Sequence, residues 1–254
     1  MHKAILVQTR GIALMSAVTL LAVSFFLAPP AVSAAPPAIQ KGHIVREDIE
    51  WLDVWLPNTN NHDLPRILLI GDSITRGYGP RVEANLKGVA YVSRIATSKS
   101  LGDPALMMEV ALVLQEQSFD IIHFNNGLHG KDYTQEEYAA ALPILLAVLH
   151  HYDPDARLVW ASSTDVRQKD HLDAVSPDTE RSVQRNAAAA AIVTKKDIPV
   201  DDLFTLVKDH PEYHVNDGVH FTDDGYTVLA AQVAKTIKAV LDSPGFHPNL
   251  HKAE

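Results

Sequence analysis

The sequence contains no cysteine. This absence excludes disulfide bonds, thiolate metal sites, a cysteine nucleophile and a lipid-modified N-terminal cysteine. The chain also has no run rich in lysine or arginine, and its formal net charge is −9. An acidic chain without such a run is not expected to bind nucleic acid or an anionic membrane surface. A chain of 254 residues can nevertheless bury a sizeable core without disulfides.

A long apolar run lies near the N-terminus. Two basic residues precede an almost wholly apolar stretch at 11–28, two prolines follow it, and small residues at 32–34 suit a signal peptidase. We therefore expect residues 1–34 to be a signal peptide, which makes membrane contact transient and the mature chain periplasmic or extracellular. An uncleaved membrane anchor is the alternative, because about 18 apolar residues can just span a bilayer.

The rest of the chain predicts a leader with a packed extension (35–65), without regular strands, followed by one domain (66–254). In that domain short apolar runs alternate with amphipathic helical patterns, which favours a parallel sheet covered on both faces. We predict an α/β fold, a three-layer α/β/α sandwich with a mostly parallel five-stranded sheet. The expected strands are 67–70, 90–92, 121–124, 158–161 and 198–201, and the expected helices are 104–117, 135–150, 178–194 and 223–241.

Polar residues follow the predicted strands at the points where ligands bind in such sheets, the carboxyl ends. Ser73 comes directly after the first strand, within Gly71-Asp72-Ser73. A serine hydroxyl is a poor nucleophile unless a base lies within hydrogen-bond reach, and its backbone N–H can face a developing oxyanion. The alternative is that Ser73 merely caps the next helix.

His220 is the candidate base, and Asp217 lies three residues before it. On a short loop this spacing lets the carboxylate meet one imidazole nitrogen while the other nitrogen faces the serine. The alternative is a plain turn with a surface histidine. Thr222 is predicted to be the N-cap of the last helix, which anchors this loop.

These two segments resemble the first and last motif blocks of the SGNH (GDSL) hydrolase superfamily of esterases and lipases, over residues 66–241. The resemblance implies a flavodoxin-like sheet and a catalytic triad of Ser73, Asp217 and His220. It also implies that the N–H groups of Ser73 and of a glycine in the second block bind the oxyanion. Gly102 is the best match for that glycine; the alternative is an ordinary loop glycine.

The third block departs from the family pattern of Gly-x-Asn-Asp. Aligning Gly127 with the family glycine puts His129 where the family has the asparagine that donates to the oxyanion. A neutral imidazole can donate one hydrogen bond, so His129 can take that role. Alternatively Asn126 supplies the amide and His129 packs beneath the site, or neither residue acts.

The other histidines predict structure rather than a metal site. His123 lies in a buried strand and is expected to be hydrogen-bonded in the core. His210 and His214 have a helical metal-ligand spacing, but Pro211 disfavours a regular helix there. No metal and no cofactor is implied.

The sequence thus predicts an exported serine esterase acting on small acyl esters, with acetate on a carbohydrate as the preferred substrate. No long apolar lid is visible that would hold a fatty chain. A lysophospholipase or general lipase is one alternative, and a glycan-binding protein that kept the fold without turnover is another.

Overall fold

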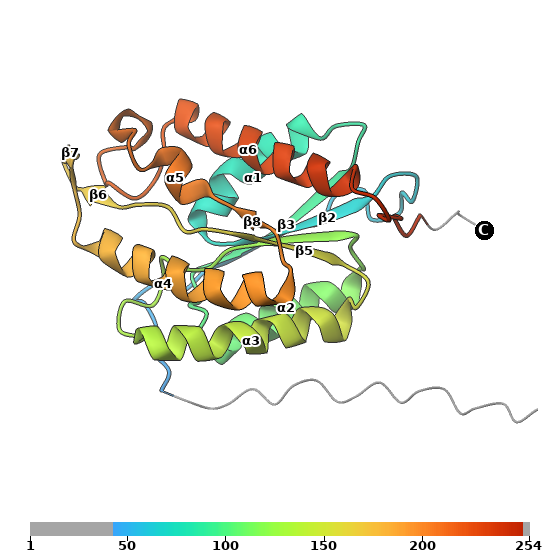
Figure 1. Ribbon diagram of the computed structural model, residues 1–254, viewed down its shortest axis with the longest axis horizontal. Coiled ribbons are helices and arrows are strands. Elements are labelled where there is room, and N and C mark those ends of the chain that lie inside the picture. The colour runs from blue at the N-terminus through green and yellow to red at the C-terminus, as the bar shows by residue number, and fades with distance from the viewer. Residues whose placement is uncertain (1–42, 251–254) are drawn as a thin grey trace, which may run out of the picture. The chain divides into compact units, whose positions relative to one another are not determined.

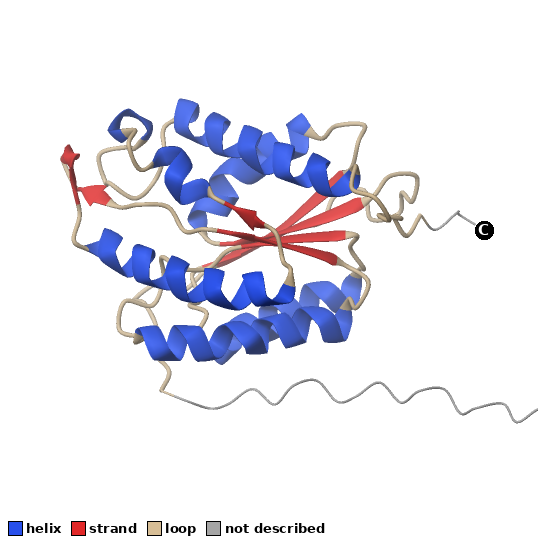
Figure 2. Cartoon of the chain, viewed as in Figure 1, coloured by secondary structure: helices blue, strands red, loops and turns tan. Residues whose placement is uncertain are grey.

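The computed structural model describes residues 43–250. The predicted signal peptide (1–34) and residues 35–42 of the predicted leader and extension lie outside these residues. Within them, the chain forms one central sheet between two layers of helices (Figures 1 and 2).

The sheet has six strands in the order β1-β3-β2-β4-β5-β8. The strand β1 is antiparallel to its neighbour β3, and the other five strands run parallel. The five parallel strands have the flavodoxin-like order β3-β2-β4-β5-β8. In this order the chain adds β3 on one side of β2 and then all later strands on the other side. The strands are β1 (Leu52–Trp55), β2 (Arg66–Gly71), β3 (Tyr91–Thr97), β4 (Ile121–Phe124), β5 (Arg157–Ala161) and β8 (Val200–Asp201).

The helices divide between the two faces of the sheet, with α1 and α6 on one side and α2, α3 and α4 on the other (Figure 1). A separate two-stranded hairpin, β6 with β7, lies between β5 and α4 in the chain. The helices are α1 (Ser73–Asn85), α2 (Pro104–Glu116), α3 (Gln135–Tyr152), α4 (Asp178–Val193), the short α5 (Leu203–Val207) and α6 (Asp223–Leu241), and the hairpin strands are β6 (Arg167–Gln168) and β7 (His171–Val175).

The continuous apolar run of β2 is explained by burial on both sides of the sheet. Leu68 and Ile70 belong to the core under α2, α3 and α4, whereas Ile67 and Leu69 belong to the core under α1 and α6. Successive residues of a strand point to opposite faces, so a strand covered on both faces needs apolar residues throughout. The predicted three-layer α/β/α arrangement is confirmed.

The expectation that the N-terminal extension lacks regular strands is wrong, and the sheet has six strands rather than five. β1 pairs residue by residue with β3, from Leu52 opposite Thr97 to Trp55 opposite Arg94. β1 is an edge strand of only four residues with mostly exposed side chains, too short for its sequence to show a distinct pattern. Its hydrogen bonds to β3 define it, and they are not visible in a local pattern.

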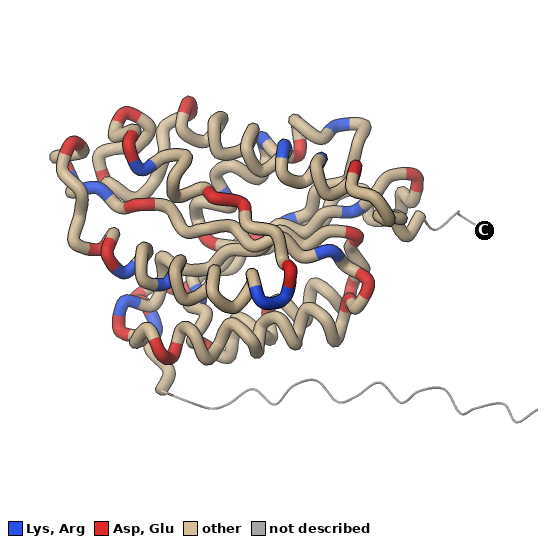
Figure 3. The backbone as a smooth tube through the Cα atoms, in the orientation of Figure 1, with Lys and Arg blue, Asp and Glu red and all other residues tan. Residues whose placement is uncertain are grey.

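The predicted helices are all present, with ends within two residues of those expected. Thr222 is the N-cap of α6, as predicted: its hydroxyl accepts a hydrogen bond from the Gly225 N–H at 3.2 Å. Acidic and basic residues are interspersed along the described chain (Figure 3). Between residues 43 and 250, no helix is both long and apolar enough to cross a membrane.

Candidate active site

Ser73 is the first residue of α1, directly after the carboxyl end of β2. The N-cap of this helix is Asp72, whose Oδ1 accepts a hydrogen bond from the Ile74 N–H at 2.9 Å. Ser73 is therefore not the cap, and as the first helical residue its N–H has no acceptor within the helix. A Cβ at Gly71 would lie 2.0 Å from Thr75 Oγ1, so only glycine lets the first turn of α1 approach the strand this closely.

The structure brings Ser73, His220 and Asp217 together in one chain of contacts. The Ser73 Oγ lies 2.8 Å from His220 Nε2, and His220 Nδ1 lies 2.7 Å from Asp217 Oδ2. A carboxylate can only accept, so the Nδ1 nitrogen carries the hydrogen. In the neutral imidazole the Nε2 nitrogen is then the acceptor, and it can receive the hydroxyl hydrogen of Ser73.

Asp217 is also bound to its own loop. Its Oδ1 accepts the N–H groups of Val219 and His220, both at 2.8 Å. Partial burial by itself would raise the pKa of the Asp217 carboxyl, but these hydrogen bonds and the one from the His220 ring outweigh it and lower that pKa. The side chain therefore remains an anion wherever the imidazole can act as a base.

A backbone contact holds the loop of Asp217 against the β6–β7 hairpin. Gly218 has a φ of +76°, and its carbonyl accepts the Arg167 N–H at 2.7 Å. A Cβ at Gly218 would lie 2.2 Å from the Arg167 carbonyl oxygen. Both the left-handed backbone and the close approach require glycine here. The hairpin thus fixes the residue between the carboxylate and the imidazole.

Gly102 and Asn126, two of the candidate oxyanion donors, belong to one hydrogen-bonded loop structure. The Gly102 N–H donates to Ser100 Oγ at 3.2 Å. The Asn126 side chain is buried; its Nδ2 donates to the Lys99 carbonyl at 2.7 Å, and its Oδ1 accepts the Leu101 N–H at 2.8 Å. Asn126 therefore fixes the loop that carries Gly102 and keeps one amide hydrogen beyond the bond to Lys99.

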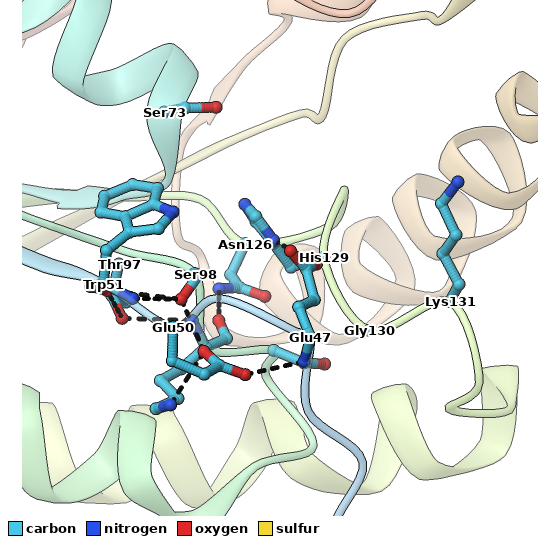
Figure 4. A network of polar contacts seen from close by, with 12 residues as sticks. Glu47, Glu50, Trp51, Ser73, Thr97, Ser98, Asn126, His129, Gly130 and Lys131 are labelled. Atoms are coloured by element: carbon cyan, nitrogen blue, oxygen red, sulfur yellow. Dashed lines mark hydrogen bonds and ion pairs between the residues drawn. The ribbon is translucent and has the colours of Figure 1, made fainter.

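His129, the other candidate donor, contacts a carboxylate that the sequence did not point to. Its Nδ1 lies 2.7 Å from Glu47 Oε1, and Glu47 belongs to the extension before β1. In Figure 4 the imidazole lies between Glu47 and the side of the site that carries Ser73. The single hydrogen of a neutral His129 therefore faces Glu47.

Arg185 of α4 is a second residue that the sequence reasoning missed. It is fully buried, and its guanidinium donates to the carbonyls of Gly127 and His129 at 3.0 and 2.7 Å. It also donates to the carbonyls of Gly130 and Tyr133 at 2.7 and 3.2 Å. Burial, and then the nearby Arg181, lower the pKa of Arg185 to about 10. This cation holds the shape of the loop after β4.

The three other histidines that the sequence singled out lie in structural contacts. His123 is buried, and its Nε2 lies 3.0 Å from Asp201 Oδ2, which confirms the prediction of a hydrogen-bonded core histidine. His210 contacts Glu212, whereas His214 is buried against Asp165. Across residues 43–250 no group of three or more histidine or carboxylate side chains is arranged to hold a metal ion.

Comparisons of the sequence find no match among protein-family models or curated proteins. Comparison of the structure does find similar proteins. An aryl esterase from M. smegmatis is 14% identical over 69% of this chain and 99% of its own, with a TM-score of 0.57. Est24, a carbohydrate acetylesterase from Sinorhizobium meliloti, is 12% identical over 69% and 99%, with a TM-score of 0.58. A GDSL-like lipase from Bacteroides thetaiotaomicron is 15% identical over 68% and 88%, with a TM-score of 0.50.

The described domain therefore has the fold of the SGNH (GDSL) hydrolases, as the resemblance of its motifs predicts. At identities this low the likeness concerns the fold alone. What the chain does has to be argued from the side chains at the carboxyl ends of its strands.

Proposed function

We propose that the chain is an exported serine esterase that hydrolyses short acyl esters, with O-acetyl groups on a carbohydrate as its substrate. The observation that carries this proposal is the hydrogen-bonded series from Ser73 Oγ through His220 to Asp217. Serine, imidazole and carboxylate in this order are the components of acyl transfer without a cofactor.

The reaction proceeds in two halves. His220 Nε2 takes the hydroxyl hydrogen as Ser73 Oγ bonds to the ester carbonyl carbon, and the carbonyl oxygen becomes an oxyanion. The bond to the alcohol oxygen then breaks, and His220 gives its proton to the departing alcohol. In the second half His220 takes a proton from water, the resulting hydroxide displaces Ser73 from the acyl group, and the proton returns to the serine.

Three groups are proposed to stabilise the oxyanion. The Ser73 N–H has no acceptor within α1, and the Gly102 N–H makes only a long bond to Ser100 Oγ that an oxyanion can replace. The third is the amide hydrogen of Asn126 that the Lys99 carbonyl does not use. His129 is the weaker candidate for this third position, because its hydrogen faces Glu47.

A short acyl group and a polar alcohol suit the surroundings of the site. Side chains of the triad are open to solvent, with 42% of the His220 side chain exposed. A cavity of about 370 Å³ at this end of the sheet, which the triad residues do not line, has polar and charged walls, including Glu50, Ser98 and Lys131. Such walls favour a hydroxyl-rich ligand over a fatty chain. The proposal of export rests on the N-terminal sequence alone.

Hydrolysis of p-nitrophenyl esters of increasing acyl length tests this proposal, with wild type and Ser73→Ala compared. We expect turnover to be highest for acetate and to fall with chain length. Ser73→Ala should lower kcat by about 10⁴-fold or more, because no other group supplies the nucleophile. Circular dichroism and the melting temperature are expected to be unchanged in the variant, since Ser73 is not the helix cap.

The outcomes separate the alternatives. Turnover that persists in Ser73→Ala contradicts the mechanism. Preference for long acyl chains indicates a lipase or lysophospholipase. Absence of turnover on every ester, together with affinity for glycans, indicates a binding protein on a hydrolase fold.

A further inference from the structure

The segment 45–51 contacts two of the loops that carry candidate site residues, those after β3 and β4. The Val45 N–H donates to the Tyr133 hydroxyl at 2.9 Å, which joins the segment to the loop after β4. Glu50 accepts from Ser98 Oγ at 2.5 Å and pairs with Lys99 Nζ at 2.8 Å, which joins it to the loop after β3. The segment is therefore a fixed wall of the site.

Glu47 in this wall determines which nitrogen of His129 faces outward as an acceptor. Because a carboxylate only accepts, the Nδ1 nitrogen that lies 2.7 Å from Glu47 Oε1 carries the hydrogen. The Nε2 nitrogen of the neutral ring then offers a lone pair. Among residues 43–250 we find no hydrogen bond to this Nε2 atom, and 15% of the His129 side chain is exposed.

Two further contacts fix the ring and the backbone that carries it. The indole of Trp51 lies edge-on to the ring, with ring centroids 6.3 Å apart and an interplanar angle of 72°. The Arg185 guanidinium donates to the His129 backbone carbonyl at 2.7 Å. The Nε2 nitrogen thus has a defined direction, toward the side of the site that carries Ser73 in Figure 4.

The cavity beside this pair is suited to hydroxyl groups. Glu47 lines it, and Ser98, Ser100 and Lys131 contribute polar atoms to its walls. His129 itself does not line this cavity; its Nε2 faces the side of the site that carries Ser73, so a ligand that reaches from there toward the cavity meets an acceptor and needs a donor. A sugar presents such a donor, because a free hydroxyl stands on the carbon next to the acetylated one.

We propose that Glu47 and His129 form a second carboxylate–imidazole pair whose Nε2 accepts a hydrogen bond from a hydroxyl of the substrate's alcohol portion. His129 is the specificity residue, and Glu47 is a positioning residue that acts through it. This proposal rests on the proposed esterase function. It adds an acceptor that favours an ester whose alcohol carries a second hydroxyl over an ester whose alcohol has none. It also makes the N-terminal extension part of the active site.

The test compares two substrates: p-nitrophenyl acetate, whose alcohol has no second hydroxyl, and a methyl glycoside with a single O-acetyl group beside a free hydroxyl. His129→Ala and Glu47→Ala should each lower kcat/KM for the glycoside about tenfold, the value expected for one lost hydrogen bond. Both variants should change kcat/KM for p-nitrophenyl acetate by less than about twofold. Glu136→Ala, which removes an exposed negative charge outside the cavity lining, is the control and should change neither.

Two further measurements keep the proposal testable if a variant folds poorly. In the double variant, Glu47→Ala should add no loss on the glycoside beyond that of His129→Ala, because the carboxylate acts through the ring. The wild-type enzyme should lose about tenfold in kcat/KM on a glycoside acetate whose adjacent hydroxyl is replaced by hydrogen. This second measurement needs no variant.

Equal losses on both esters overturn the proposal, because they indicate a role in the oxyanion site or in folding. No loss on the glycoside overturns it as well, as does a wild-type enzyme that cleaves p-nitrophenyl acetate but no sugar acetate. In those cases the esterase function stands. Turnover of either ester by Ser73→Ala is the separate result that removes the esterase mechanism itself, and this proposal with it.

Discussion

At the scale of the residue, Asp217 has more contacts than orientation of an imidazole requires. One carboxylate oxygen accepts a hydrogen bond from the Nδ1–H of the His220 ring. The other oxygen accepts hydrogen bonds from two backbone N–H groups of the same loop. These bonds tie the ring position to the loop shape. They also lower the pKa of the Asp217 carboxyl below its ordinary value of 3.8, against the effect of partial burial. The carboxyl therefore stays ionised at lower pH than an ordinary aspartate does.

Asp217→Asn should lower kcat for p-nitrophenyl acetate by about 10³–10⁴-fold, with little change in KM. An amide N–H in place of the carboxylate favours the wrong tautomer, in which Nε2 carries the hydrogen and cannot accept from Ser73. Steady-state kinetics at neutral pH measure the effect, with Asp209→Asn, an exposed aspartate eight residues earlier in the chain, as the control. A loss below tenfold would mean that His220 does not depend on this carboxylate.

At the scale of the element, α4 supports the site from beneath. It contributes no triad residue, yet Arg185 from its middle binds four carbonyl oxygens of the loop after β4. A guanidinium has five donors in a fixed plane, which allows one side chain to bind several carbonyls of a loop at once. Of the four, the Gly130 carbonyl also accepts the Tyr133 N–H within the loop. The loop that carries His129 is therefore ordered by a helix that is distant in the sequence.

Arg185→Met should lower the free energy of unfolding by about 3 kcal/mol, because it keeps the apolar stem and leaves buried carbonyls without donors. Urea unfolding followed by circular dichroism gives the value. Arg181→Met is the matched control on the same helix; its partner is Asp178 three residues away near the surface, and it should cost less than about 1 kcal/mol. Similar costs for the two variants would remove the assigned role of Arg185.

At the scale of the whole molecule, the free energy of unfolding depends on pH through carboxyl groups whose pKa values are shifted in opposite directions. The pKa of Asp217 is lowered, whereas that of Asp153 is raised. Asp153 is buried at the end of α3, where its side chain accepts the Phe119 N–H. Burial raises the pKa of Asp153 to about 6, although the Phe119 hydrogen bond opposes the shift. Because the pKa of Asp153 is raised in the folded state, the contribution of this carboxyl to stability is complete below about pH 4. That contribution is lost as the pH rises through about 6.

Asp153→Asn should therefore raise the free energy of unfolding at pH 7.5 by about 1–2 kcal/mol, since the amide keeps an acceptor for Phe119 and carries no buried charge. The gain should vanish at pH 4, where the wild-type carboxyl is protonated. Urea unfolding at the two pH values measures it. Asp173→Asn, an exposed aspartate of β7 that is not among the charges acting on Asp153, should show no such difference between the two pH values. For Asp153→Asn, a gain of equal size at both pH values would contradict the titration argument.

The sequence by itself determined the parts of this protein that depend on local pattern. The apolar run of β2 indicated burial on both faces, and the three-layer sandwich followed from its alternation with helical patterns. The residue types and order of Ser73, Asp217 and His220 were sufficient to nominate them, because each stands beside a glycine or a cap that fixes its loop. Their hydrogen-bonded geometry agrees with that nomination, and their catalytic role stays a prediction.

Only the tertiary structure decided the features that depend on partners distant in the chain. β1 is defined by its hydrogen bonds to β3, because four residues with mostly exposed side chains are too few to give a distinct pattern. Glu47 contacts His129, and Arg185 contacts the loop after β4, although each pair is far apart in the sequence. Periodic patterns report on neighbours within one helix or strand, so they cannot predict these contacts. The proton on His129 is the clearest case: both tautomers fit the sequence, and the position of one carboxylate in space selects between them.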